Sequence, residues 1–140
     1  MKKMSLFLIS FSLALAANAN TITANRTICS PQDHDMTTGP FTTTCDWSKW
    51  KRGDDADALI TLTGKQNVHA ECYFMGSDPI AWIRGMKQAD VNVIAPPDQF
   101  SFDIGYKNDS HYDQNQNLAI YLANFPPSYD NVLTCTFTAK

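Results

Sequence analysis

The last ten residues of the chain, 131–140, alternate between apolar and polar side chains. A period of two is typical of a β-strand with one face buried and the other in water. Residues 67–74 repeat the pattern and place Cys72 on their apolar face. The sequence therefore predicts two inward-facing strands and a Cys72–Cys135 disulfide that links two layers of extended chain. The apolar positions of the last strand are Leu133, Cys135 and Phe137.

The other two cysteines, Cys29 and Cys45, are separated by a short segment rich in proline, glycine and threonine. An even number of cysteines in an exported protein favours complete pairing into disulfides. Four cysteines allow three pairings. Among these we expect Cys29–Cys45 together with Cys72–Cys135. The spacings match no zinc-binding template.

Residues 1–19 have the pattern of a secretory signal peptide. Lys2 and Lys3 precede an apolar run over 6–17, and cleavage is expected after Ala19. This run is too short to span a membrane, and no second long apolar stretch follows. We therefore expect a single exported domain over residues 20–140 that is either secreted or periplasmic. The two lysines and the short apolar run are typical of a bacterial signal peptide.

The expected mature chain is acidic. The sequence has 11 basic and 14 acidic residues, so removal of Lys2 and Lys3 leaves 9 against 14, a formal charge of −5. This balance argues against nucleic acid as the main partner. All the acidic residues except Glu71 are aspartates, which favour turns over helices.

Short alternating segments separated by turn residues predict an all-β fold, an antiparallel β-sandwich or small barrel of about seven to eight strands. Two segments are ambiguous: 80–84 is a strand or a helical turn, and 117–124 is a strand or a short helix. Gly64, Lys65 and Gln66 predict a hairpin between 57–63 and 67–74. The other expected strands are 20–30, 41–46, 91–95, 100–106 and the last strand.

The first candidate site is the segment 47–52, in which two tryptophans alternate with basic residues. Exposed indoles and neighbouring cations can contact a carbohydrate or another protein. The alternative is that a tryptophan packs into the core while the cations are merely solvated. The candidate binding residues are Trp47, Lys49, Trp50, Lys51 and Arg52.

The second candidate is a metal site at Asp33, His34 and Asp35. An imidazole between carboxylates can bind zinc or copper or can transfer protons. His69 and His111 would complete a site of three histidines if the fold brought them together. The alternative is that all three histidines are surface residues, because no established metal-binding spacing is present.

The third candidate is the acidic run 53–57, which could bind calcium. One run rarely supplies the six or more oxygen ligands that calcium requires, so a solvated turn is favoured. No nucleophile elbow, phosphate-binding loop or dinucleotide fingerprint occurs. We expect a non-enzymatic binding module without a cofactor that contacts carbohydrate or protein. The alternatives are a small hydrolase that acts with or without a metal ion, using His34, His69 or His111 with a nearby aspartate, and an inhibitor of a foreign enzyme.

Overall fold

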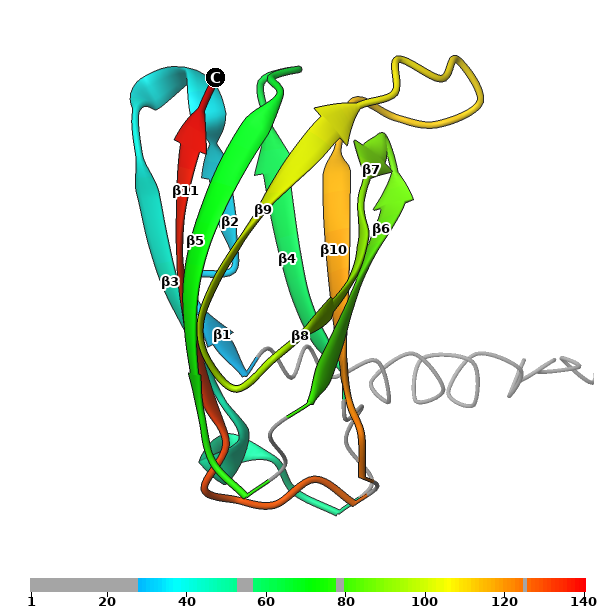
Figure 1. Ribbon diagram of the computed structural model, residues 1–140. Coiled ribbons are helices and arrows are strands. Elements are labelled where there is room, and N and C mark those ends of the chain that lie inside the picture. Colours follow the sequence, from blue (N-terminus) through cyan, green and yellow to red (C-terminus); the bar gives the residue numbers. More distant parts are fainter. Residues whose placement is uncertain (1–27, 53–56, 78–79, 125) are drawn as a thin grey trace, which may run out of the picture.

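The computed structural model describes residues 28–52, 57–77, 80–124 and 126–140 (Figure 1). In these ranges the chain forms eleven strands and two short 3-10 turns, and no α-helix. The first six strands are β1 (Cys29–Ser30), β2 (Asp33–Asp35), β3 (Phe41–Asp46), β4 (Ala58–Thr63), β5 (Val68–Met75) and β6 (Ala81–Lys87). The other five are β7 (Ala89–Asp90), β8 (Asn92–Ala95), β9 (Asp98–Tyr106), β10 (Gln116–Leu122) and β11 (Val132–Ala139). The 3-10 turns are η2 (Met36–Thr38) and η3 (Trp47–Lys49).

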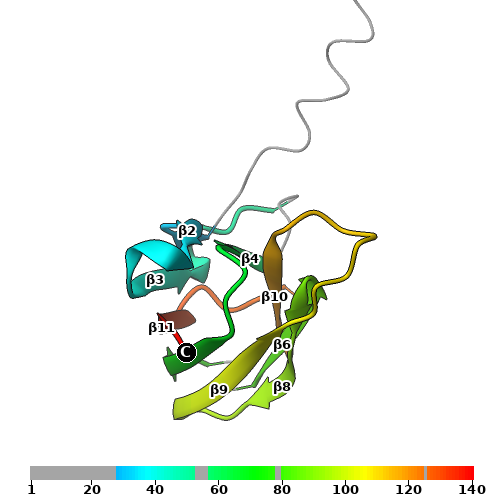
Figure 2. The same cartoon turned by 90° about the horizontal axis from the view of Figure 1, so that it is seen from above.

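The strands form two sheets that enclose one interior (Figure 2). Sheet A has the strand order β1-β3-β11-β5-β9-β7, and sheet B has the order β2-β4-β10-β6-β8. The pairs between described strands are antiparallel, except that β2 runs parallel to β4. The prediction of an all-β sandwich is confirmed. The expected number of about seven to eight strands is wrong.

The additional strands come from two segments that cross between the sheets. Residues 29–35 supply β1 to sheet A and β2 to sheet B, and residues 89–95 supply β7 to sheet A and β8 to sheet B. At the second crossing the backbone N–H of Gly85 donates to the Val91 carbonyl at 2.7 Å. A β-carbon at Gly85 would lie only 2.2 Å from the Ala89 carbonyl oxygen, so this crossing requires glycine. The strands that the sequence did not predict, β2 and β7, have three and two residues, which is too short to show a period of two.

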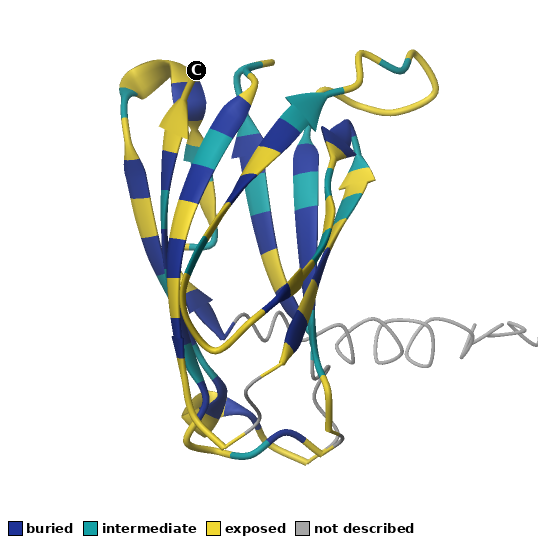
Figure 3. Cartoon of the chain, in the orientation of Figure 1, coloured by how far each residue is buried: buried dark blue, intermediate teal, exposed yellow. Residues whose placement is uncertain are grey.

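The inward faces of both sheets form one apolar core, visible as alternating dark bands along the strands in Figure 3. Burial of each large aliphatic side chain contributes roughly 1.5–3 kcal/mol, which explains why the alternating positions face inward. In sheet A these residues include Val68, Ala70, Phe74, Leu133 and Phe137. In sheet B they include Ala58, Ile60, Leu62, Ile83, Leu118 and Ile120.

Both predicted disulfides, Cys29–Cys45 and Cys72–Cys135, are present. Their cysteines lie directly opposite each other on neighbouring strands, β1 with β3 and β5 with β11. The expectation that Cys72–Cys135 links two layers is therefore wrong, because both disulfides lie within sheet A. Opposite β-carbons of neighbouring strands are about 4.5–5.5 Å apart, whereas packed sheets are about 10 Å apart. The first separation is close to what a disulfide requires, so the register of β1 with β3 and of β5 with β11 lets both pairs close within one sheet.

The predicted hairpin between 57–63 and 67–74 is also wrong. β4 pairs with β2 and β10 in sheet B, whereas β5 pairs with β9 and β11 in sheet A. The turn at Gly64 and Lys65, which both have positive φ angles, carries the chain from one sheet to the other. A short turn permits either arrangement. Because each strand has only one apolar face, the two strands can bury these faces against each other across the core.

Both ambiguous segments are strands, since 80–84 contributes to β6 and 117–124 contributes to β10. The predicted signal peptide, 1–19, and all but the end of the expected first strand, 20–30, lie outside the described residues. Within the described part of the chain, no helix has the length and hydrophobicity needed to cross a membrane.

Candidate functional site

The two tryptophans of the predicted contact segment lie in the interior. Trp47 is 0% exposed and Trp50 is 6% exposed. The Trp47 ring meets Phe74 edge-on at 6.4 Å between centroids, and its backbone N–H donates to the Asn131 carbonyl at 3.0 Å. The Trp50 ring packs against Tyr129 at 6.0 Å. The premise that two exposed indoles contact a ligand is therefore wrong.

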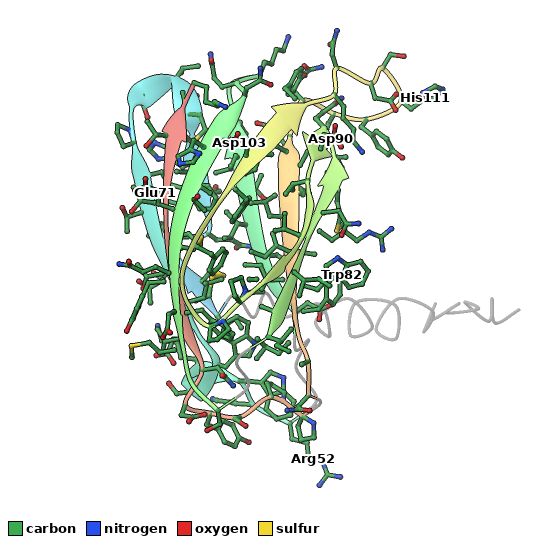
Figure 4. The ribbon with its side chains drawn as sticks, viewed as in Figure 1. Arg52, Glu71, Trp82, Asp90, Asp103 and His111 are labelled. Carbon is green, nitrogen blue, oxygen red and sulfur yellow. A yellow bond between two sulfur atoms is a disulfide. The ribbon has the colours of Figure 1, made fainter. Side chains whose placement is uncertain are left out.

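The basic residues of this segment are exposed, and Figure 4 shows the Arg52 side chain at the base of the molecule, pointing away from it. The segment turns here because the Asp46 carboxylate caps η3 and accepts the Ser48 backbone N–H at 2.9 Å. Hydrogen bonds from the Ser48 side chain and backbone lower the pKa of Asp46. The fold thus separates the cations from the indoles. A binding role for Lys49, Lys51 and Arg52 stays a prediction.

The candidate metal ligands around His34 are engaged in local structure. The His34 ring stacks on Phe41 at 4.7 Å between centroids, and its Nε2 lies 3.1 Å from the Gly39 carbonyl oxygen. The Asp35 carboxylate accepts the backbone N–H and the hydroxyl of Thr37 at 2.9 and 2.8 Å. The backbone hydrogen bond is the main reason that the pKa of Asp35 is lowered. Asp33 is exposed on the same short strand.

Among the described residues, no group of three or more histidine, cysteine, aspartate or glutamate side chains is placed to hold a metal ion. The fold therefore does not gather His34, His69 and His111 into the site of three histidines that we considered. The acidic run 53–57 lies outside the described residues except for Asp57.

Two of the histidines pair with aspartates at the surface. His69 Nδ1 lies 2.7 Å from Asp103 Oδ1, and Lys140 Nζ lies 3.0 Å from Asp103 Oδ2. Hydrogen bonds from these two side chains, chiefly from His69, lower the pKa of Asp103. His111 Nδ1 lies 2.8 Å from Asp109 Oδ1. A hydrolytic triad would also need a nucleophile, and no hydroxyl in the described part of the chain hydrogen-bonds either imidazole.

A row of large side chains crosses the outer face of sheet B. Tyr121 on β10, Trp82 on β6 and Ile94 on β8 lie opposite one another across three strands. Trp82 is 40% exposed and Ile94 is 73% exposed. Figure 4 shows Trp82 on the outside of the molecule, far from Arg52. These three residues, with the exposed Ile80, are named the aromatic patch.

Three neighbours hold the Trp82 side chain in one orientation. Its ring lies 5.3 Å from the Tyr121 ring, tilted by 35°. Its Nε1 donates a hydrogen bond to Asn92 Oδ1 at 2.5 Å. The guanidinium carbon of Arg84 lies over the ring, 5.7 Å from its centroid, in a cation–π contact. A side chain fixed in this way loses little conformational entropy when a partner binds.

Two hollows flank Trp82 and Arg84 on this face. The first, of about 270 Å³, is largely apolar and is lined by the aromatic patch with Leu122 and Ala123. The second, of about 430 Å³, is named the basic hollow, because Arg84, Lys87 and Lys107 line it together with a single acid, Asp109. The outer face of sheet B therefore changes from apolar to basic along β6.

Sequence reasoning missed the aromatic patch, although part of its signal was present. In 80–84 apolar residues occupy both faces of the expected strand, a pattern that also fits a strand buried on both sides. Trp82 lies between Ala81 and Ile83, and these two are the residues that face the core. Only the pairing of β6 with β8 and β10 brings Ile94 and Tyr121 beside Trp82.

Comparisons of the chain with models of known protein families, with curated proteins and with solved structures found no match. The fold and its cross-links define the class as an all-β, disulfide-linked β-sandwich. The aromatic patch and the basic hollow are the features of its surface on which a functional argument can be built.

Proposed function

We propose that the protein is an exported, non-enzymatic module that binds another protein through the aromatic patch and the basic hollow. The observation that carries this proposal is the row Tyr121, Trp82 and Ile94 across sheet B, in which Trp82 and Ile94 are exposed and Tyr121 is half-buried. Tryptophan, tyrosine and arginine are the residue types that most often dominate the energy of protein interfaces. Here Arg84 lies directly against Trp82, so all three types meet at one point.

The geometry favours a protein over a sugar on this face. A sugar ring stacks on the open face of an aromatic side chain, but Arg84 lies over the Trp82 ring and Tyr121 is tilted against it. A protein side chain can instead enter the apolar hollow of about 270 Å³ beside the ring. This hollow suits an aliphatic or aromatic anchor of the partner.

The charge of the surface indicates the chemistry of the partner. Arg84, Lys87 and Lys107 line the basic hollow. Lys87 is already paired with Asp113 at 2.7 Å, so acidic groups next to the apolar anchor would complement chiefly Arg84 and Lys107. A second copy of the chain is disfavoured. A symmetric dimer through this face would bring the cations of both copies into one interface, because a two-fold interface uses the same surface of each copy.

Export is the second part of the proposal. It is supported by the predicted signal peptide over 1–19 and by the two disulfides, which persist in oxidising compartments such as the periplasm or the extracellular space. Mass spectrometry of the protein recovered from the periplasm or the culture medium of its natural host tests this part of the proposal. We expect a chain that begins at Asn20 with both disulfides oxidised, and a chain that retains Met1 would contradict export.

The binding proposal can be tested with a displayed library of random peptides selected on the folded protein. We expect enriched peptides that combine an apolar anchor with aspartate or glutamate. Their binding should fall at least about tenfold, or about 1.4 kcal/mol, when Trp82→Ala removes the centre of the patch. Arg84→Gln should weaken the acidic peptides selectively.

The matched control is Arg52→Gln, which removes an exposed cation at the other end of the molecule and should leave binding unchanged. Three results would contradict the proposal. The library could give no enrichment, the enriched peptides could bind Trp82→Ala as well as wild type, or the protein could be a dimer that Trp82→Ala dissociates.

A further inference from the structure

The outer face of sheet A carries a groove of opposite character to the aromatic patch. It is open, has a volume of about 560 Å³ and crosses strands β11, β5 and β9. Its side chains belong to outward positions that lie opposite one another in the sheet, such as Glu71 with Ser101 and Tyr73 with Gln99. Figure 4 places Glu71 on the side of the molecule away from Trp82. We name this feature the polar groove; its outward side chains are Glu71, Tyr73, Gln99, Ser101, Thr134 and Thr136.

Two groups of hydrogen-bonding side chains line the polar groove. The hydroxyls of Thr134 and Thr136 bond to Thr44 and Thr42 at 3.2 and 2.9 Å, and so form one fixed wall. Within the described part of the chain, the side chains of Tyr73, Gln99 and Ser101 make no hydrogen bond. Tyr73 and Ser101 can therefore each offer a hydroxyl to a ligand, and Gln99 can offer an amide. None of the three has to give up a hydrogen bond within the protein.

The charge of the groove selects against an anionic ligand. Glu71 is the one ionisable carboxylate on its wall, and no lysine or arginine lines it. Lys140, which follows β11, is bound to Asp103 at 3.0 Å. A sulfate, phosphate or uronate would meet the Glu71 carboxylate with no lysine or arginine on the wall to offset it, although His69 Nε2 lies 3.7 Å from that carboxylate.

Tyr73 adds an apolar surface to these polar groups. It is 43% exposed, and its ring lies among the hydroxyl and amide groups of the groove. Sugars combine hydroxyl groups with apolar C–H faces, which can pack on an aromatic ring. Most of the side chains that line the groove are polar, and Tyr73 and Phe100 are its aromatic members, whereas a protein interface of this size has a larger apolar centre. An open groove also accepts a chain that extends beyond both of its ends.

From these observations we propose that the polar groove binds a short stretch of a neutral oligosaccharide. Tyr73 packs on one sugar face, while Glu71, Gln99 and Ser101 hydrogen-bond the hydroxyl groups. This site is separate from the aromatic patch, so the module would hold a glycan on sheet A and a protein partner on sheet B.

The test is a titration of the isotope-labelled protein, residues 20–140, with oligosaccharides. Two-dimensional NMR of the backbone amides follows the binding. The probes are maltohexaose, cellohexaose and chitohexaose, with an oligogalacturonate as the anionic comparison. We expect at least one neutral probe to shift amides of β5, β9 and β11 in a saturable manner. Tyr73→Ala should weaken this binding at least about tenfold, and Gln99→Ala should weaken it less.

Tyr129→Ala is the matched control, since it removes an exposed tyrosine outside the polar groove and the aromatic patch and should not change sugar binding. The proposal is overturned if no neutral probe shifts the groove amides, if oligogalacturonate binds more tightly than every neutral probe, or if Tyr73→Ala binds as well as wild type. Loss of sugar binding in Trp82→Ala together with unchanged binding in Tyr73→Ala would show that the sugar binds sheet B and not sheet A. None of these results depends on whether the aromatic patch binds a protein.

Discussion

The side-chain amide of Gln88 hydrogen-bonds the backbone of Asp109 in both directions. Its Nε2 donates to the Asp109 carbonyl at 2.5 Å, and its Oε1 accepts the Asp109 N–H at 2.6 Å. The same Nε2 also donates to the Asp113 carbonyl at 3.0 Å. Gln88 is buried and follows β6 directly, so it ties the polar loop after β9 to the strand that carries Trp82. It thereby fixes one wall of the basic hollow, which this loop supplies through Lys107 and Tyr112.

Gln88→Ala should therefore loosen this loop. The backbone groups of Asp109 and Asp113 would lose their partner, and we expect a loss of about 1–3 kcal/mol of unfolding free energy. Hydrogen exchange of the amides over 107–115 should become faster. Gln99→Ala, at an exposed position, is the control and should change neither quantity. Unchanged exchange over the loop in Gln88→Ala would contradict the role assigned to this side chain.

The tryptophans should divide into structural and binding residues. Trp47→Ala removes a buried ring and should cost about 3–5 kcal/mol of stability. Trp82→Ala removes a half-exposed ring and should cost about 1 kcal/mol or less. Urea unfolding followed by circular dichroism measures both values. Equal destabilisation by the two variants would mean that Trp82 serves the fold more than it serves binding.

The two disulfides should differ in their contributions to stability. Cys72–Cys135 closes a chain separation of 63 residues, and Cys29–Cys45 closes one of 16. In the chain-entropy model these loops are worth about 4 and about 3 kcal/mol, respectively. The paired alanine variants should therefore unfold at different urea concentrations, with the Cys72 and Cys135 pair the less stable. The opposite order would show that strain or residual structure outweighs loop length.

The Asp103 contacts should contribute to stability in a pH-dependent way. Hydrogen bonds from His69 and Lys140 lower the pKa of Asp103 below its ordinary value of 3.8, because they favour the ionised carboxylate in the folded state. This contribution is therefore present above pH 3.8 and is lost as the pH falls through the lower folded-state pKa. Asp103→Asn should make the loss of stability in acid less steep, as measured by urea midpoints between about pH 6 and about pH 2.

Lys140→Ala provides an internal comparison for this prediction. It removes the smaller of the two hydrogen-bond contributions and leaves the bond to His69, so its acid profile should lie between those of wild type and Asp103→Asn. Identical acid profiles for wild type and Asp103→Asn would contradict the assignment.

Patterns within single segments predicted the class of fold correctly. The alternation in 131–140 and 67–74 identified inward faces, and placing Cys72 and Cys135 on those faces led to the correct disulfide pairing. The same reasoning failed where pairing between segments decided the outcome. The turn at Gly64 could join neighbours in one sheet or cross to the other sheet, and the apolar faces of the two strands are satisfied by either arrangement until the whole core is packed.

The candidate site shows the same division. The pattern around Trp47 and Trp50 suggested an aromatic surface, but burial of both rings in the core removed it. Trp82 attracted no functional prediction, because an apolar residue inside an apolar strand normally indicates burial.

The sequence by itself determined that this chain forms strands and which face of each strand is apolar, because these properties depend on residue type and on a period of two along the backbone. The tertiary structure alone decided which strands are neighbours and therefore which outward side chains gather. Tyr121, Trp82 and Ile94 come from three separate parts of the chain, and only the register of β10, β6 and β8 places them in one row.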